Sequence, residues 1–321
     1  MASQISIYDE SLDESISDGI PKKYKHLKDK IFGDWEIPPW DLDKKDVIGI
    51  GTFGKVYKAL WRGTPVAAKV NNDITHEDKK DMNREVNTLI QIHHPNIVQI
   101  FGFVEEPFAL VMELMPNRDL NNYLKQKKPN LKKKKEICGD VLRGLEYLHE
   151  RKPNSLIHRD IKPQNIVLTQ SGHAKIADFG LSRFIGDKLK REISSSSLTV
   201  IAPMVQITHT IVKNKNDEDL TDNIGSKKYM SPEMRNLNAY DHKTDIWSAG
   251  IVFAELFENQ SFDAFQDNSK FKWKTTPINI QNIINQYMLR REPESRSSAG
   301  EILVLFNTLH DNSSKKGCTC M

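Results

Sequence analysis

The string GIGTFGKV at 49–56, with three glycines, constrains the fold of this chain more than any other feature. Its GxGxxG pattern is shared with the dinucleotide-binding fingerprint, which requires a helix directly after the glycines. Here residues 55–59 alternate and are β-branched, and the chain then turns back through Arg62-Gly63-Thr64. The pattern predicts a β-hairpin, and it favours a hairpin that holds a nucleotide over a dinucleotide-binding fold.

Lys69 lies in the next strand-like run, at 65–70. The glycines before it would let backbone amides approach phosphate oxygens with no Cβ in the way. A lysine in an apolar strand needs a partner, because burying its charge unpaired is costly. The predicted partner is Glu85, on a helix expected at about 76–92. The alternative is an edge lysine that points into water, and we favour the paired lysine.

A second group of polar residues occurs in HRDIKPQN at 158–165. Phosphoryl transfer requires a group that accepts the hydroxyl proton, cations that neutralise charge, and alignment. Asp160 can be the base, and Lys162 can bridge to a γ-phosphate. Asn165 and Asp178, the latter in the DFG string, can offer hard oxygens to Mg²⁺. Each motif alone is weak, but their order and spacing behind a glycine hairpin predict ATP-dependent phosphoryl transfer.

With these motifs the chain resembles the eukaryotic-type protein kinases over about 44–310. The resemblance implies an α+β, bilobal protein-kinase fold, with a β-rich N-lobe that carries one main helix and a mainly helical C-lobe. It implies ATP and Mg²⁺ as cofactors and a protein as substrate. The residues that it assigns to ATP are Ile48, Gly49, Gly51, Gly54, Val56, Ala67, Lys69, Glu85, Met112 (as gatekeeper), Glu113 and Met115 (in the hinge), and Val167. It makes Asp160, Lys162 and Asn165 catalytic, and Asn165 and Asp178 ligands of the metal.

The same resemblance assigns supporting roles. Leu89, His158 and Phe179 match an internal spine, and Asp245 matches an aspartate that braces the catalytic loop. Arg296 matches an arginine that pairs with the glutamate of the SPE string at 231–233, and we expect this pair to be buried.

Lys162 and Ser226 resemble the serine/threonine class of kinases. The strings WEIP at 35–38 and WRGTPVAAK at 61–69 resemble the tyrosine-kinase-like group, whereas the catalytic loop is closer to other serine/threonine kinases, so the subgroup stays open. A pseudokinase or scaffold is the alternative function. The complete motif set argues against it, and the short stretch between Leu256 and Arg296 argues for it.

The predicted domains are an N-terminal tail at 1–43, mostly disordered, a kinase domain at 44–310 and a C-terminal tail at 311–321. The N-lobe would span 44–115 and the C-lobe 116–310, with a long activation segment at 178–233. We expect strands near 47–50, 55–59, 65–70, 97–103 and 108–114, and a helix at 136–149.

The activation segment is longer than the family usually shows. It is either a surface insert or a regulatory element. In the second case a phosphate, on Thr221 or on one of Ser194–Ser197, would bond Arg159.

The net charge of +3 is too small to indicate a nucleic-acid partner, and three cysteines are too few for a disulfide framework. With no apolar leader or spanning segment, we expect a cytoplasmic protein.

The lysine run at 132–135 is interpreted as a solvated surface before a helix, with a docking patch as the alternative. Cys318, four residues from the end, is either an exposed thiol or a prenylation site that would give peripheral membrane association. The oligomeric state is not indicated.

Overall fold

The structure is a computed structural model of the chain, which divides into two compact units. The sheet unit comprises 1–91 and 100–114, and the helical unit comprises 92–99 and 115–321. Among the described residues, no helix has both the length and the apolar composition needed to cross a bilayer. The residues that the structure describes are 20, 22–27, 30, 33–51, 54–70, 86, 89–90, 92–152, 155–179, 183–185, 227–236, 240–261 and 273–309.

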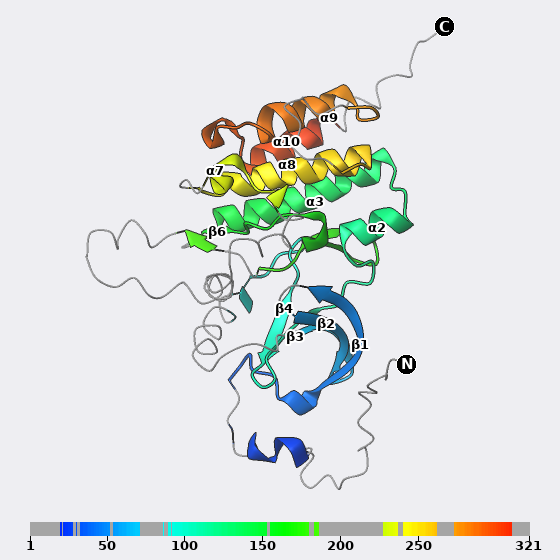
Figure 1. Cartoon of the computed structure of the whole chain (residues 1–321), viewed down its shortest axis with the longest axis vertical. Coiled ribbons are helices and arrows are strands. Elements are labelled where there is room, and N and C mark those ends of the chain that lie inside the picture. Colours follow the sequence, from blue (N-terminus) through cyan, green and yellow to red (C-terminus); the bar gives the residue numbers. More distant parts are fainter. Residues whose placement is uncertain are drawn as a thin grey trace, which may run out of the picture. The chain divides into compact units, whose positions relative to one another are not determined.

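A curled antiparallel sheet with the strand order β1-β2-β3-β5-β4 makes up most of the sheet unit (Figure 1). The predicted hairpin is confirmed, because β2 pairs antiparallel with β3. Its turn residues, Arg62 and Gly63, both have positive φ (47° and 84°), which suits the twist of a two-residue hairpin. The strands are β1 (Leu42–Gly51), β2 (Gly54–Trp61), β3 (Thr64–Val70), β4 (Ile100–Val104) and β5 (Ala109–Glu113), and short 3-10 helices span Lys22–Leu27 and Pro39–Asp41.

One face of this sheet forms an apolar core, because side chains alternate between the two faces of a strand. Alternate residues of β3 contribute Val66, Ala68 and Val70, and β5 contributes Ala109 and Val111. The predicted helix at 76–92 falls mostly outside the described residues. Val86, Leu89 and Ile90 are helical there and buried.

The edge strand β4 is covered by a segment that precedes β1. The Ile37 N–H donates to the Phe103 carbonyl at 2.7 Å, and the Phe103 N–H donates to the Trp35 carbonyl at 3.0 Å. Ile37 and Leu42 are buried in the sheet core. Residues 35–42, predicted from the sequence to belong to a tail, therefore protect a sheet edge from open pairing.

Replacing Gly102 with alanine is expected to destabilise this edge. A Cβ at Gly102 would lie 2.4 Å from the Trp35 carbonyl oxygen, and a backbone atom cannot move aside cheaply. Overpacking of this kind costs roughly 1–3 kcal/mol, to be measured by urea denaturation. Gly33→Ala is the matched control, since a Cβ there meets no described atom within 4 Å. Equal stabilities for the two variants would contradict the packing of this segment on β4.

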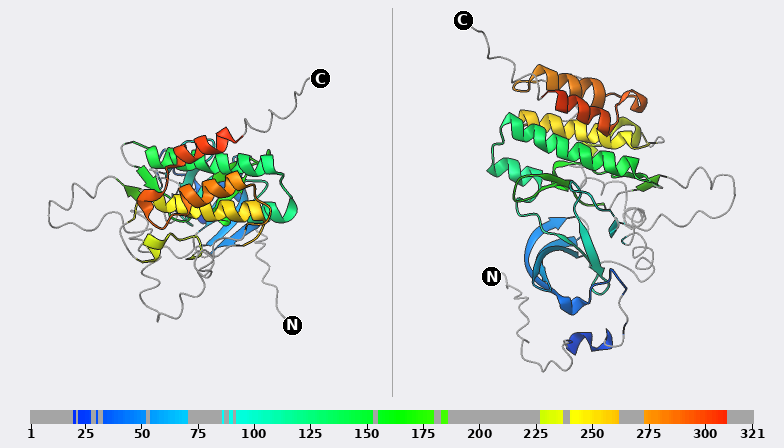
Figure 2. Two further views of the ribbon diagram at one scale, coloured as in Figure 1. Left: turned by 90° about the horizontal axis from the view of Figure 1, so that it is seen from above. Right: turned by 180° about the vertical axis from the view of Figure 1, so that it is seen from behind.

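The helical unit is built around α8, which is buried along nearly its whole length. Figures 1 and 2 show α3 beside α8, with α9 and α10 stacked near them. The helices are α2 (Leu120–Gln126), α3 (Leu131–Glu150), α7 (Pro232–Arg235), α8 (Lys243–Glu258), α9 (Ile278–Ile283) with a π-helical turn at Ile284–Met288, and α10 (Ala299–Thr308), with 3-10 turns at Pro163–Asn165 and Pro293–Ser295. The short strands are β6 (Ser155–Ile157), β7 (Ile166–Leu168), β8 (Ala174–Ile176) and β9 (Arg183–Ile185).

A β-rich unit followed by a mainly helical unit confirms the predicted α+β, bilobal fold class. Two details differ from the sequence-based expectation. The lysine run lies inside the first turns of α3, not before the helix. Residues 97–99, expected to begin a strand, belong to the helical unit, where the Val98 N–H donates to the Ile176 carbonyl at 2.9 Å.

Candidate functional site

The sheet places four predicted nucleotide residues on one face. Val56 lies opposite Lys69, and Ala67 lies opposite Met112. Directly paired residues of antiparallel strands project to the same face, as do residues two apart on one strand. Val56, Ala67, Lys69 and Met112 therefore share the face opposite the apolar core. This face combines apolar side chains with one ammonium, a combination that suits a flat base and a phosphate.

The glycine string forms the end of the β1–β2 hairpin. Gly51 pairs with Gly54, and Thr52 and Phe53 between them lie outside the described residues. Gly54 has φ 140°, which favours glycine. At Gly49 a Cβ would make only an ordinary contact with Val56, at 3.6 Å. The conformational requirement for glycine is thus clearest at Gly54.

The remaining nucleotide predictions lie on other parts of the chain. Ile48 lies in β1 at a register shift, and Glu113 ends β5, where it pairs with Val66 of the core face. Met115 belongs to the helical unit, as does Val167 in β7. Glu85, the predicted partner of Lys69, is outside the described residues.

The helical unit brings Asp160, Lys162 and Asn165 into direct contact. Lys162 Nζ lies 2.7 Å from Asp160 Oδ2. Asn165 Nδ2 donates to the same oxygen at 2.8 Å and to the Asp160 carbonyl at 2.8 Å. The 3-10 turn at 163–165, which begins with a proline, returns the asparagine to the aspartate. One carboxylate oxygen, Oδ2, thus accepts both bonds.

Asp178 follows directly on a segment bonded to this loop. The Ala177 N–H donates to the Asn165 carbonyl at 2.8 Å, and the His158 ring bonds the Ala177 carbonyl through Nε2 at 3.0 Å. The Phe179 ring lies 5.1 Å from the His158 ring. Asp178 itself is exposed, with φ 62°. The backbone therefore couples the DFG string to the catalytic loop, as the resemblance implies.

A buried carboxylate braces the loop from behind. Asp245, on α8, accepts from the backbone N–H of His158 at 2.9 Å and of Arg159 at 2.8 Å. His149 Nε2 lies 2.9 Å from the same carboxylate. Arg159 has φ 67°, a conformation that costs a non-glycine residue roughly 1–3 kcal/mol unless its surroundings enforce it. The hydrogen bonds to Asp245 supply that enforcement.

A second buried carboxylate, Glu233 of α7, pairs with Arg296. Arg296 Nη1 and Nη2 donate to the two carboxylate oxygens at 2.7 and 2.8 Å. Arg296 is 1% exposed, so the prediction of a buried pair is confirmed. The pair joins α7 to the segment that leads into α10.

Acid is expected to weaken the helical unit through both carboxylates. Burial alone would raise each pKa, but hydrogen bonds from His149 and the His158 backbone leave the pKa of Asp245 below its usual value, and those from Arg296 do the same for the pKa of Glu233. The unfolded chain then binds these protons at higher pH than the folded chain, so stability is full above about pH 4.5 and declines as pH falls through the lowered pKa values. Urea denaturation between pH 7 and pH 3 measures this, with Glu233→Gln as a variant that should flatten the slope. A stability that rises toward low pH would contradict it.

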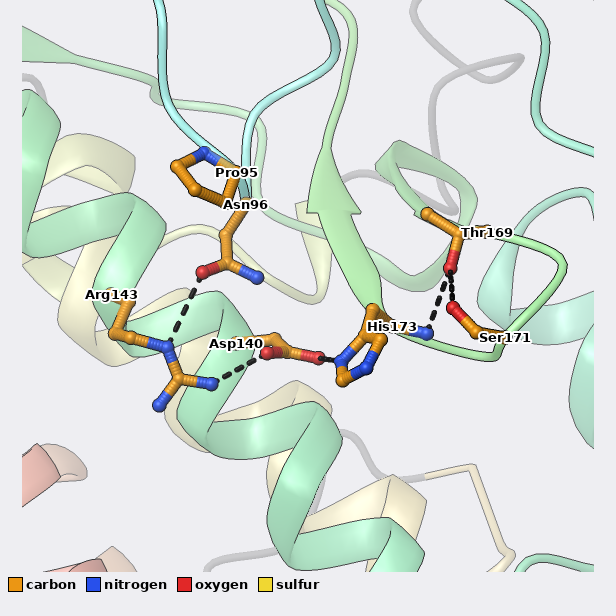
Figure 3. A pocket seen from close by; sticks show the side chains of 7 residues that line it. All are labelled: Pro95, Asn96, Asp140, Arg143, Thr169, Ser171 and His173. Atoms are coloured by element: carbon orange, nitrogen blue, oxygen red, sulfur yellow. Dashed lines mark hydrogen bonds and ion pairs between the residues drawn. The ribbon is translucent and has the colours of Figure 1, made fainter.

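A separate polar pocket of about 390 Å³ lies in the helical unit (Figure 3). At its centre Asp140 accepts from Arg143 Nη2 at 2.5 Å and from the Ala174 N–H at 2.9 Å. Asn96 bonds Arg143 Nε and the Ala174 carbonyl. These groups satisfy one another, so we assign the pocket to the packing of α3 against β7 and β8. It contains none of the predicted catalytic residues and is lined by Pro95, Asn96, Asp140, Arg143, Thr169, Ser171 and His173.

Comparison with known proteins identifies the family. The model of the protein kinase domain matches residues 42–320. The chain belongs to the protein kinase family. Among its curated relatives, the serine/threonine-protein kinase VIK of Arabidopsis thaliana is 37% identical over 71% of this chain and 48% of its own length. Serine/threonine-protein kinase 12 of the same plant is 32% identical over 74% of this chain and 47% of its length.

A probable serine/threonine-protein kinase of Dictyostelium discoideum is 30% identical over 87% of this chain and 29% of its own length. This kinase chain therefore spans less than half of the length of each of these relatives. The relatives are consistent with the serine/threonine class and with ATP as the phosphoryl donor, as predicted.

Two contacts of this kinase were not anticipated from its sequence. Arg159 Nη1 donates to the Tyr240 hydroxyl at 2.6 Å, and the Tyr229 hydroxyl donates to Glu255 Oε2 at 2.9 Å. Lys228 Nζ lies 2.6 Å from the other oxygen of Glu255. These contacts join residues far apart in the chain, so no local sequence pattern predicts them.

Several predictions fall on residues outside the described part of this kinase. They are the phosphorylation candidates Ser194–Ser197 and Thr221, the class marker Ser226, and the prenylation candidate Cys318.

Proposed function

We propose that this protein is a serine/threonine kinase that transfers the γ-phosphoryl group of ATP to protein hydroxyls. The observation that carries the proposal is the geometry of Asp160, whose two side-chain partners, Lys162 and Asn165, both bond Oδ2. In the described part of the chain, Oδ1 receives no hydrogen bond. The free oxygen of a fixed carboxylate can accept a proton, which is the property of a general base.

In the proposed reaction, Asp160 Oδ1 accepts the proton of a serine or threonine hydroxyl while the oxygen of that hydroxyl forms a bond to the γ-phosphorus of ATP. The bond from that phosphorus to the β,γ-bridging oxygen breaks, and ADP leaves. Lys162 would offset negative charge on the transferred group. The ammonium of Lys69 and the glycine-loop amides would position the phosphates.

The other nucleotide contacts are proposed from the sheet register and the resemblance. Val56, Ala67 and Val167 would enclose adenine, next to Met112. Backbone groups at 113–115 would bond the adenine edge, and Ile48 would lie at the border of the base. The pairing of Lys69 with Glu85 remains a proposal.

The donor set of the helical unit fits a magnesium ion. The amide nitrogen of Asn165 donates to Asp160, whereas Asn165 Oδ1 receives no hydrogen bond from any described residue. Together with the exposed carboxylate of Asp178 it offers hard oxygen ligands. No cluster of three or more His, Cys, Asp or Glu occurs among the described residues, which suits an ion held by one or two protein oxygens plus phosphates. When bound, Mg²⁺ would neutralise charge on the phosphates.

The proposal is tested by incubating the purified chain with labelled ATP, Mg²⁺ and casein, followed by phospho-amino-acid analysis. Phosphoserine or phosphothreonine is the expected product. Phosphotyrosine alone would overturn the class. Nucleotide binding without any transfer would favour the pseudokinase, a reading that the short stretch between Leu256 and Arg296 also favours.

Lys69→Met is expected to lower the transfer rate at least tenfold, because the phosphates lose a positioning cation. The measurement is kcat and KM for ATP in the same assay. Lys152→Met, an exposed lysine of the helical unit, is the matched control. An unchanged kcat/KM in Lys69→Met would remove Lys69 from the phosphate contacts.

We further propose a kinase domain over 44–310, with 1–43 and 311–321 as flanking segments, of which 35–42 pack on the sheet. The kinase itself would be cytoplasmic, and its substrate would be a protein. A prenyl group on Cys318 would add peripheral membrane association, and an unmodified C-terminal peptide by mass spectrometry, from cells with a farnesyl transferase, would exclude it.

A further inference from the structure

The chain between α2 and α3 concentrates positive charge. Residues 120–135 include seven lysines and no aspartate or glutamate. The seven lysines are Lys125, Lys127, Lys128, Lys132, Lys133, Lys134 and Lys135. The stretch comprises α2, a four-residue connection and the first turns of α3, at one edge of the helical unit (Figure 1).

The structure divides these lysines into two sets. Lys133 Nζ pairs with Glu136 at 3.1 Å, and Lys134 Nζ donates to the Phe257 carbonyl at 2.9 Å. Both ammonium groups are therefore used within the protein. We name the other five the lysine patch (Lys125, Lys127, Lys128, Lys132 and Lys135). Their side-chain ammonium groups have no hydrogen-bond or ion-pair partner among the described residues.

An apolar side chain accompanies the patch. Leu131, the first residue of α3, is 44% exposed, although most leucines of this unit are fully buried. Lys135 follows it by four positions, and residues three and four apart share a face of a helix, whereas Lys132 is its next neighbour in the chain. Asn130 caps the helix by accepting from the Lys133 N–H at 2.9 Å, which fixes the orientation of this first turn. This face thus presents Leu131 beside the side chain of Lys135.

The composition of the patch favours an extended anionic surface over a discrete anion. Discrete phosphates and carboxylates are usually gripped by the planar fork of arginine, and residues 120–135 contain no arginine. Lysines are mobile point charges that need no defined partner geometry. Clusters of four to eight basic residues on a helix are typical of binding to acidic lipid headgroups, with apolar side chains entering the interface.

We propose that the lysine patch, with Leu131, binds the surface of a membrane that contains acidic lipids. Attraction to the headgroups would come from the five ammonium groups, and Leu131 would enter the region between headgroups and acyl chains. The inference depends neither on phosphoryl transfer nor on a prenyl group at Cys318.

The test is sedimentation with vesicles of phosphatidylcholine, with and without phosphatidylserine, using the full chain with Cys318→Ser made in bacteria. Binding is expected only with phosphatidylserine, and it should decrease as salt is raised, because salt screens exposed charges. The triple variant Lys127→Ala/Lys128→Ala/Lys132→Ala should bind about a hundredfold more weakly, at roughly fivefold per lysine. Leu131→Ala should weaken binding severalfold without changing the salt dependence.

Matched controls separate the patch from net charge and from exposed apolar surface. Lys152→Ala/Arg290→Ala/Arg291→Ala removes three exposed cations elsewhere in the helical unit, and Val304→Ala trims an exposed apolar residue of α10. Both should bind vesicles like the parent chain. Thermal unfolding and casein phosphorylation in solution should be unchanged in the triple lysine variant.

Two results would overturn the proposal. Equal losses in the lysine triple variant and its charge-matched control would show that net charge alone drives binding. Binding to polyglutamate but not to phosphatidylserine vesicles would assign the patch to an acidic protein. Because no variant in this experiment alters a proposed catalytic residue, its failure leaves the kinase proposal untouched.

Discussion

Replacing Asp160 with asparagine is expected to lower the rate of phosphoryl transfer by at least ~10²-fold, and by up to ~10⁴-fold, the usual contribution of a general base. The amide keeps the shape of the carboxylate. Its oxygen can take the place of Oδ2 and accept from Lys162 and Asn165, which bond that oxygen at 2.7 and 2.8 Å. The amide nitrogen then takes the place of Oδ1, where it presents donors to the incoming hydroxyl and can accept no proton. The loss should therefore appear in kcat, measured at saturating ATP and casein.

Asparagine has nearly the same shape as aspartate, so a lower rate can be attributed to the lost base and not to altered packing. Thermal unfolding and the Kd for ATP should match the parent protein, because both contacts to the loop persist. Asp241→Asn is the matched control. Asp241 is an exposed carboxylate of the same unit that accepts from the Lys243 N–H at 2.8 Å, and an asparagine serves equally well there. A kcat within a few-fold of the parent in Asp160→Asn would remove Asp160 from the role of base.

The residues of the catalytic loop could be related to one another from sequence because their contacts are local. Asp160 and Asn165 are five positions apart, and the proline between them limits the backbone conformations of the loop. The β2–β3 hairpin could also be predicted, because the alternation of side chains along a strand and a glycine turn are short-range sequence signals. Neither prediction required knowledge of any distant segment.

Contacts between distant segments could not be predicted from local sequence patterns. Arg159 and Tyr240 are 81 positions apart in the chain, yet Arg159 Nη1 lies 2.6 Å from the Tyr240 hydroxyl. The brace from Asp245 to the loop was expected only through the family resemblance. Residues 35–42 were predicted to belong to the tail because the β pattern of the sequence begins only near Asp46, and only the open edge of β4 explains why Ile37 is buried.

The start of α3 shows a different limitation. Apolar periodicity begins only near Ile137, so the pattern predicted a helix from 136, whereas the helix begins at Leu131. The first turn carries lysines, which have good helix propensity but no periodic apolar signal. The stronger signal was Asn130, whose side chain caps the helix. A cap can therefore locate a helix end that hydrophobic periodicity misses.

Replacing Glu233 with leucine is expected to destabilise the protein by roughly 3–5 kcal/mol, the usual effect of leaving one member of a buried ion pair alone. All five N–H donors of Arg296 are satisfied. Two bond Glu233, and the rest bond the carbonyls of Arg290, Lys243 and Arg291 at 2.7, 3.0 and 3.0 Å. Because Arg296 is 1% exposed, water cannot replace the lost carboxylate. Such a loss is a large part of the ~5–15 kcal/mol that stabilises a typical domain.

Urea denaturation of Glu233→Leu, Arg296→Met and the double variant separates the ion pair from the packing around it. If the single losses come from an uncompensated buried charge, the double variant should be more stable than the sum of the two predicts, since it removes both charges together. Glu136→Gln provides the exposed comparison. That carboxylate pairs with Lys133 at the surface, and its loss should cost at most about 1 kcal/mol. Strict additivity of the two buried substitutions would mean that the carboxylate and the guanidinium stabilise this part of the kinase independently, despite the two hydrogen bonds between them.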